Sequence, residues 1–378
     1  MGAEESKSAA DGSAAPGSAP KPRSPQQLLE IAAQRGVVEE VHLQLAAGAD
    51  VNASLSDDRT TPLHLACMRA SFRSDAACIE ALLAAKPQVN RGDRSGAAAL
   101  HHVVQSMSDV PASTTGGALA ALRLLISAGA NVNLARGDGW TPLHIAVTVD
   151  NAEAVRVLLA AGAKPDLRVK DGRNALGVAR MDRERDLSVV KLLLAAGVSL
   201  DTMAGHEKSY SSPEPLWCHA MRNAALLDLL VPAGFNVHQR GKKGETLLCH
   251  TDREDVLRRL IALGVSVNHR ADGGRTPLMC MPYQYAFFPL LVDAGAEVNA
   301  RDKDGCTLLH YVAGIDVNPM CTRRPDTELI APIKYLLSVG ADPTIKNKDG
   351  ATPLDLAVKR NNVNAVATLE SVRSSKLV

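Results

Sequence analysis

Four histidines stand at the same place in a phrase that recurs along the chain, and imidazole is a common group for proton transfer and metal binding. They are the fourth residue of copies that read Thr-Pro-Leu-His at their best: His64, His101, His144 and His310. The four histidines fall in separate copies of the phrase, without the spacing that metal ligands on one helix have. No Ser/His/Asp order, phosphate-binding glycine loop or paired-carboxylate motif accompanies them. We therefore predict a structural role for these histidines, and expect no catalytic, cofactor or metal site.

A second group of residues has the chemistry of partner binding. Trp140 follows an Asp-Gly pair, and an exposed Trp is a preferred anchor at protein interfaces, although its ring could instead pack on a neighbouring turn. Basic residues recur in the turns of the same type: Arg136, Lys170, Arg173, Arg240, Lys242, Lys243, Arg270, Arg275, Arg301, Lys303, Lys346 and Lys348. From this group we select Trp140, Arg173, Arg240, Lys242, Lys243 and Arg275 as candidate contacts. A basic edge favours a partner with an acidic surface; the alternative is ordinary solvated charge.

Aromatic residues cluster near residue 285. Tyr283, Tyr285, Phe287 and Phe288 lie within six residues of one another. The two phenylalanines fall where a core is expected, whereas Tyr283 and Tyr285 are candidates for exposed contacts. Pro289 should weaken the helix predicted here, because an interior proline removes a backbone hydrogen bond.

The first residues carry a candidate lipidation site. The start Met1-Gly2-Ala3-Glu4-Glu5-Ser6 fits the pattern for N-myristoylation of Gly2. One acyl chain gives only marginal membrane contact.

Two recurring phrases indicate which elements position these residues. The Thr-Pro of the first phrase is typical of a helix start, since Pro loses no bond at the first helical position. The second phrase, Gly-Ala followed by Val-Asn, places Gly where a helix end needs a left-handed residue, as in LAAGADVN ending at Asn52. Asp-Gly segments such as Lys303-Asp304-Gly305 lie between a copy of the second phrase and the next copy of the first phrase, and they favour tight hairpins. The predicted unit is helix, turn, helix, hairpin, stacked into a solenoid.

The paired phrases resemble the ankyrin repeat family from about residue 25 to 371. Residues 138–166 (DGWTPLHIAVTVDNAEAVRVLLAAGAKPD) follow the family pattern almost throughout. The resemblance implies an all-α solenoid of about ten helix-turn-helix repeats with β-hairpin tips. It also implies protein–protein recognition through the hairpin tips and the inner helices, which are the first helix of each repeat.

Spacing divides the chain into segments. The distance from a Val-Asn phrase to the next Thr position is eight residues in seven of nine cases, whereas the distance across the helix pair varies from 22 to 37. Insertions near residues 68–75, 108–117 and 314–327 are therefore expected in the loops between helices. We expect a disordered tail at residues 1–24, repeats at 25–201, an extended hairpin at 202–213, repeats at 214–371 and a short tail at 372–378.

Composition is compatible with a binding module. The net charge is +1 and seven cysteines are scattered without a C-x-x-C pair, which favours free thiols in the cytoplasm, with the nucleus as the alternative. We expect neither a nucleic-acid partner nor a transmembrane segment. The predicted function is a non-enzymatic interaction module or scaffold. The alternatives are binding through the insertion edge, as a regulatory or ubiquitin-ligase adaptor subunit, and an enzyme with an unrecognised site.

Overall fold

The computed structural model describes residues 23–70, 76–108, 115–181, 186–201, 203–204, 214–314 and 330–375. The chain divides into two compact units, residues 1–163 and 164–378, and each is described by itself. The candidate Gly2 and most of each expected insertion lie outside the described residues.

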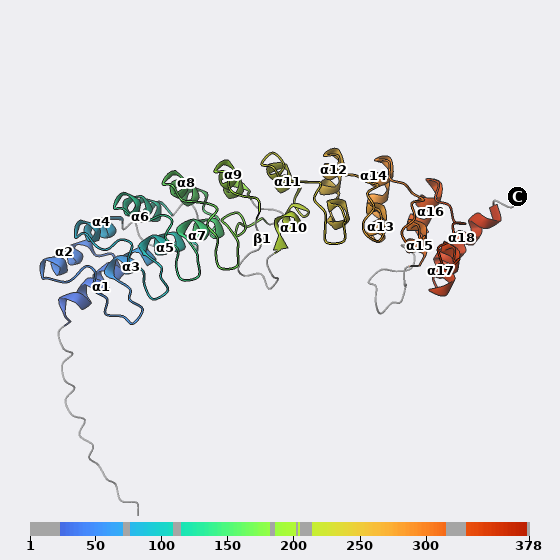
Figure 1. Ribbon diagram of the computed structural model, residues 1–378. Coiled ribbons are helices and arrows are strands. Elements are labelled where there is room, and N and C mark those ends of the chain that lie inside the picture. The colour runs from blue at the N-terminus through green and yellow to red at the C-terminus, as the bar shows by residue number, and fades with distance from the viewer. Residues whose placement is uncertain are drawn as a thin grey trace, which may run out of the picture. The chain divides into compact units, whose positions relative to one another are not determined.

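The first unit consists of two rows of helices (Figure 1). The inner helices are α1 (Pro25–Arg35), α3 (Pro62–Met68), α5 (Ala99–Gln105) and α7 (Pro142–Thr148). The outer helices are α2 (Val38–Ala46), α4 (Ala76–Ala84), α6 (Gly116–Ser127) and α8 (Ala152–Ala160). Each helix packs on its partner in the repeat and on the next helix of its own row, as expected of a solenoid.

The second unit repeats this plan with shorter inner elements. These are α10 (Leu216–Ala220), the 3₁₀ helix η2 (Leu247–His250), α13 (Pro277–Cys280), α15 (Leu308–Ala313) and α17 (Pro353–Lys359). The outer helices are α9 (Ser188–Ala195), α11 (Ala224–Leu230), α12 (Glu254–Ala262), α14 (Phe288–Asp293), α16 (Ile330–Ser338) and α18 (Val363–Ser375). Strands β1 (Met203–Ala204) and β2 (Glu214–Pro215) pair antiparallel, with Met203 opposite Pro215. The last helix therefore continues four residues past the boundary expected at 371.

The helix boundaries follow the sequence signals. Inner helices α3, α7, α13 and α17 begin at the Pro of the first phrase, after an extended Thr. Outer helices end before glycines with positive φ, including Gly48 at 89° and Gly340 at 92°. Left-handed backbone costs other residues about 1–2 kcal/mol, which explains the glycine. The core between the rows is mainly Leu, Val and Ala, with Phe288 fully buried.

Two repeats depart from the expected helix pair. In the fifth repeat, residues 175–178 form turns instead of a helix. Gly177 stands there in the place of the histidine, its N–H donates to the Asn174 side chain at 3.1 Å, and glycine disfavours a helix by about 1 kcal/mol. The division between the units falls beside this repeat, at Ala163/Lys164.

In the repeat around residue 285, Pro289 lies at the start of α14 and not inside a helix. A 3₁₀ turn, η3 (Tyr285–Phe287), precedes α14. The expectation of an interior proline was wrong, because the helix begins at Phe288 and Pro289 loses no bond there.

Candidate partner-binding surface

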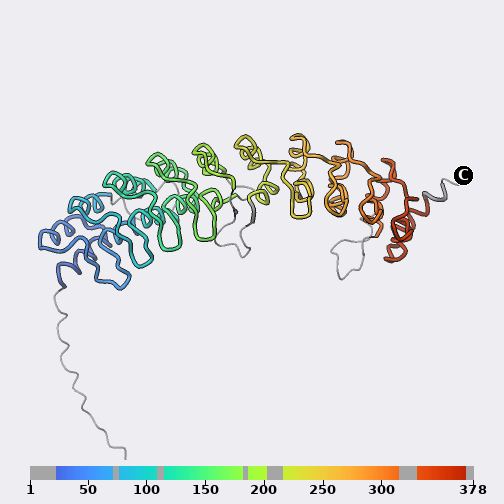
Figure 2. The backbone as a smooth tube through the Cα atoms, viewed as in Figure 1, coloured from blue at the N-terminus to red at the C-terminus, as the bar shows by residue number. Residues whose placement is uncertain are grey.

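Short loops, here called fingers, connect one repeat to the next beside the helix rows (Figure 2). Except for residues 53–60, each described finger has a backbone hydrogen bond across its tip, such as Asp302 N–H to Cys306 O at 3.0 Å. The described fingers are residues 53–60, 91–97, 134–140, 167–173, 239–245, 269–275, 300–306 and 345–351. An isolated bridge joins Arg240 and Thr246, so among these fingers the β-hairpin tips are mostly turns without paired strands.

Neighbouring fingers are joined by backbone hydrogen bonds. Gly137 N–H donates to Ser95 O at 2.8 Å in the first unit, and Lys303 N–H donates to Gly273 O at 2.9 Å in the second. Gly274 has φ 74°, and a Cβ there would lie 2.8 Å from the Lys303 nitrogen. The finger glycines thus permit both the turn and the contact with the next finger.

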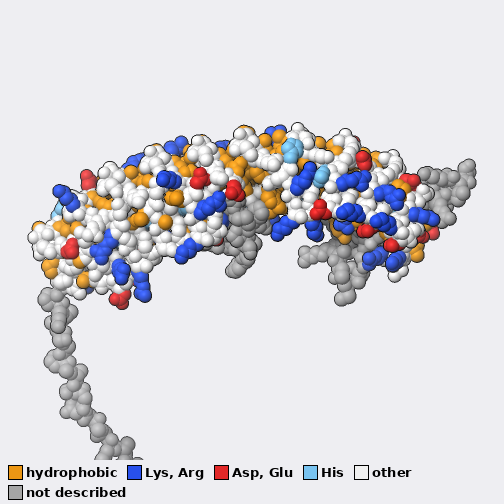
Figure 3. All heavy atoms as spheres, in the orientation of Figure 1, with side chains coloured by type: hydrophobic (Ala, Val, Ile, Leu, Met, Phe, Trp, Pro, Cys, Tyr) orange, Lys and Arg blue, Asp and Glu red, His pale blue; other side chains and the backbone are white. Residues whose placement is uncertain are grey.

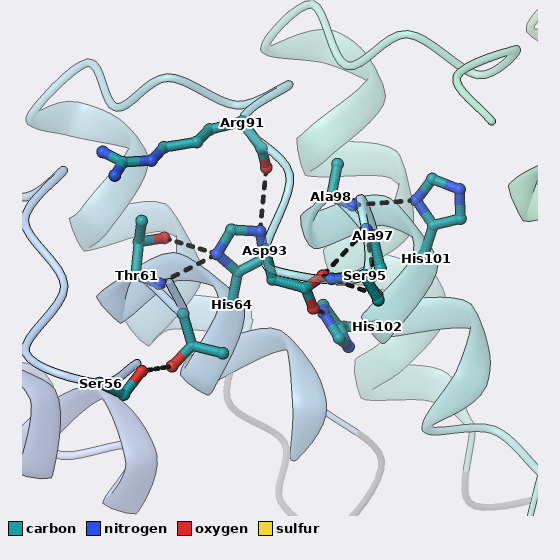
Figure 4. Close-up of polar contacts among 11 residues, drawn as sticks. Ser56, Thr61, His64, Arg91, Asp93, Ser95, Ala97, Ala98, His101 and His102 are labelled. Carbon is teal, nitrogen blue, oxygen red and sulfur yellow. Dashed lines mark hydrogen bonds and ion pairs between the residues drawn. The ribbon is translucent and has the colours of Figure 1, made fainter. Parts of the chain in front are cut away.

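A recurring histidine links its own inner helix to a neighbouring finger, as His64 does (Figure 4). The Nδ1 atom of His64 accepts from Thr61 N–H at 3.0 Å, so Nε2 carries the proton and donates to Arg91 O at 3.0 Å. The imidazole is 2% exposed, and burial, helped by His102, lowers its pKa to about 4. His64 is therefore a neutral structural residue at neutral pH.

The same arrangement recurs in other repeats and is absent from two of them. His101 and His310 accept from the N–H at their own helix starts and donate to Trp140 O and Ala351 O, both at 3.2 Å. Where Cys249 and Met279 replace histidine, the hydroxyl oxygens of Thr246 and Thr276 are buried without a nitrogen or oxygen partner. The structural role predicted for the histidines is seen, and its loss at these two repeats leaves unpaired polar atoms.

A carboxylate also joins a finger to its inner helix. In the first unit, Asp93 accepts from Ser95 Oγ at 2.7 Å and from His102 Nε2 at 2.9 Å (Figure 4). Burial raises the pKa of Asp93, but hydrogen bonds from Ser95, Ala97 and His102 outweigh it and lower the pKa. Ser95 and His102 bind the same carboxylate instead of each other, so this Ser/His/Asp group has no serine–histidine contact to activate a nucleophile.

An equivalent carboxylate in the second unit explains the position of Arg275. The Tyr311 hydroxyl donates to Asp302, and Arg275 Nε donates to that hydroxyl at 3.0 Å while its guanidinium stacks on the ring at 4.7 Å. Burial, followed by the hydrogen bond to Asp302, raises the pKa of Tyr311. Arg275 is exposed but holds a defined position in the fold.

The expectation of an exposed tryptophan at Trp140 is not met. Its side chain is buried, with the residue 6% exposed, and its ring packs against His144 at 6.0 Å and under Arg136 at 5.5 Å. Arg173 is also buried at 6% exposure and pairs with Asp171 at 2.7 Å. Both side chains are held inside the finger row because the neighbouring side chains and backbone cover them, which a local sequence pattern does not reveal.

The other candidates lie at the surface. Arg240, Lys242 and Lys243 are exposed on one finger, and none has an ion pair within the described part of the chain. Tyr283 is 49% exposed, whereas Tyr285 is half-buried and packs edge-on against Phe288 at 5.8 Å. Phe287 and Phe288 are buried, as predicted.

Cations gather over the second unit on the face shown in Figure 3. The four fingers 239–245, 269–275, 300–306 and 345–351, called the basic fingers, contain nine Lys and Arg and five Asp and Glu, a net charge of +4. The described fingers of the first unit, 53–60, 91–97 and 134–140, contain four of each kind and are neutral. Sequence reasoning noted the finger cations but missed this contrast, which a sum of charge over each group of fingers would have shown.

A family model for ankyrin repeats matches residues 29–110 and 112–204, and the same geometry continues in the later repeats. The chain is an ankyrin repeat protein.

B-cell lymphoma 3 protein of Homo sapiens is 28% identical over 249 residues, which are 60% of this chain and 49% of that protein. A putative ankyrin repeat protein of Rickettsia felis is 40% identical over 75 residues, 20% of this chain and 29% of the relative. A probable E3 ubiquitin-protein ligase of Oryza sativa subsp. japonica is 35% identical over 121 residues, 31% of this chain and 21% of the relative.

This ankyrin repeat protein spans less than half the length of these three relatives. Ankyrin repeats generally mediate protein–protein interaction and are typically not enzymatic. In the described part of this one, no group of three His, Cys, Asp or Glu side chains could hold a metal ion. A search of the same residues finds no helix with the length and apolar character needed to cross a bilayer.

Proposed function

We propose that this ankyrin repeat protein is a non-enzymatic recognition module that binds a protein partner through its fingers and inner helical surface. The observation that carries the proposal is the set of exposed finger side chains that the fold does not use. Lys242 and Lys243 are exposed and form no ion pair with any described residue, while the finger arginines Arg173 and Arg275 are engaged in holding the fold. Tyr283, 49% exposed, adds an aromatic contact in the loop after α13.

We also propose that it acts in the cytoplasm or nucleus. No disulfide joins the cysteines in the described residues, which are Cys67, Cys78, Cys218, Cys249, Cys280 and Cys306. Free thiols persist where the compartment is reducing.

Affinity capture with finger variants tests the binding role. The variant Lys242→Glu with Lys243→Glu should lose partners that the wild type retains, because it reverses two exposed finger charges that form no ion pair within the described residues. Arg258→Glu is a charge-reversal control away from the fingers, since Arg258 is 61% exposed on the outer helix α12, where it pairs with Glu254. Trp140→Ala is unsuitable because it would leave a cavity.

The competing surface has its own variant. If the Lys242/Lys243 variant left the captured proteins unchanged while deletion of residues 108–117 altered them, binding would lie at the insertion edge and the proposed finger surface would be wrong.

A further inference from the structure

The basic fingers carry their cations at matching positions. In each finger the first residue of the tip turn donates its N–H to the carbonyl four residues later, which aligns Gly241, Ala271, Asp302 and Asn347. The residue before this position is basic in all four fingers: Arg240, Arg270, Arg301 and Lys346. The equivalent residues in the first unit are Gly92 and Ala135. We call the four basic residues the cation column.

The two central arginines of the cation column are positioned by the next finger. Arg270 Nη1 donates to Arg301 O at 2.6 Å, and Arg301 Nη2 donates to Lys346 O at 2.8 Å. Each guanidinium has five N–H donors, so donors remain for a ligand after these bonds form. Holding the guanidiniums in place before binding reduces the entropy that a ligand must overcome.

An open hollow lies beside the two arginines. It is lined by Arg270, Glu297, Asn299, Ala300 and Arg301. Glu297 approaches Arg270 to only 3.6 Å, and the two side chains are 59% and 49% exposed. An exposed ion pair of this kind contributes little to stability, so a carboxylate of a ligand can compete with Glu297 for the guanidinium of Arg270.

We propose that the cation column binds an extended acidic segment of a protein partner, with carboxylates at about every third residue. This inference rests on the proposed function and names its partner chemistry. Packed helices lie about 8–10 Å apart, and an extended chain rises about 3.3 Å per residue, so about three residues span one repeat. Carboxylates at that interval would meet successive cations, and arginine can bind each one in a bidentate manner.

Protein carboxylates fit this surface better than nucleic acid does. Acidic residues are interspersed among the cations, including the exposed Asp272, Asp304 and Asp349, and would oppose a continuous phosphate backbone. The four basic fingers contain no Phe, Tyr or Trp for base stacking.

Fluorescence anisotropy with two labelled peptides tests whether the spacing of the carboxylates matters. The two peptides have the same composition of Glu, Gly and Ser. In the periodic peptide a glutamate stands at every third position, and in the block peptide all the glutamates are consecutive. At physiological ionic strength, the periodic peptide should bind the full chain about tenfold more tightly than the block peptide. Equal affinities, or tighter binding of a labelled single-stranded DNA, would overturn the inference.

Variants locate the binding to the column. Arg270→Gln and Lys346→Gln should each weaken binding of the periodic peptide several-fold, and Lys346 is suitable because its side chain forms no ion pair within the described part of the chain. Arg258→Gln removes the same charge from α12 and should leave the affinity unchanged. Equal weakening by all three variants would show a nonspecific charge effect and overturn the assignment. If both peptides failed to bind while the Lys242→Glu/Lys243→Glu variant still lost captured partners, this inference would be rejected and the proposed function would stand.

Discussion

At the scale of single residues, the buried histidines make stability depend on pH. His64 must stay neutral in the fold, because its Nδ1 accepts a hydrogen bond from Thr61 N–H and Nε2–H is already donated to Arg91 O. Its pKa is about 4 in the folded protein, against 6.5 for a free side chain. Between these values the unfolded chain binds a proton that the folded chain does not, so the free energy of unfolding falls as pH falls and levels off below about pH 4.

We expect His64 alone to lower the free energy of unfolding by about 2 kcal/mol between neutral pH and about pH 5. Urea unfolding of the wild type and a His64→Gln variant at both pH values measures this, since Gln cannot titrate in the range. The wild type should lose more stability than the variant on acidification. Parallel losses in the two proteins would contradict the prediction, and an NMR titration of His64 would then show a pKa near 6.5.

At the scale of elements, the fingers depend on glycine for two separable reasons. Gly274 and Gly264 have nearly equal φ values, 74° and 78°, but only Gly274 lies against a neighbouring backbone. Gly264→Ala should therefore lower the free energy of unfolding only by the strain of the left-handed conformation, about 1–2 kcal/mol. Gly274→Ala should lower the free energy of unfolding further and also weaken the hydrogen bond from Lys303 N–H to Gly273 O.

Hydrogen exchange at the Lys303 amide measures the second effect directly. Exchange should speed up in Gly274→Ala and remain near the wild-type rate in Gly264→Ala. If both variants changed the Lys303 amide equally, the contact between fingers would not be the reason for Gly274.

The element boundaries were predictable because their signals are local. Thr-Pro and Gly set backbone angles within one turn, so the starts of α3, α7 and α17 could be read from the sequence. The burial of Trp140 could not, because the Arg136 and His144 side chains that cover it reach it only through the fold. The cation column depends on alignment between fingers more than 25 residues apart in sequence, such as Arg270 and Arg301.

At the scale of the whole molecule, the array is not equally stable along its length. In a solenoid each repeat is stabilised by its own pairing and by its immediate neighbours, so a weak repeat opens locally. The repeats that begin at Thr246 and Thr276 have inner elements of only four residues, η2 and α13, and both contain an unpaired threonine hydroxyl. We therefore expect these repeats to be weak points of the described solenoid.

Met279→His should strengthen this part by restoring the recurring contact. The new imidazole would occupy the place that His310 has in the following repeat, where Nδ1 lies 2.9 Å from the Thr307 hydroxyl and 3.1 Å from its N–H. A satisfied buried hydroxyl is worth about 1 kcal/mol, so the amides of α13 should exchange more slowly in the variant, with those of α7 unchanged. The converse change, His310→Met, should leave Thr307 unpaired and speed exchange in α15. If Met279→His instead destabilised α13, the short inner helices themselves, and not the missing histidine, would account for the weak repeats.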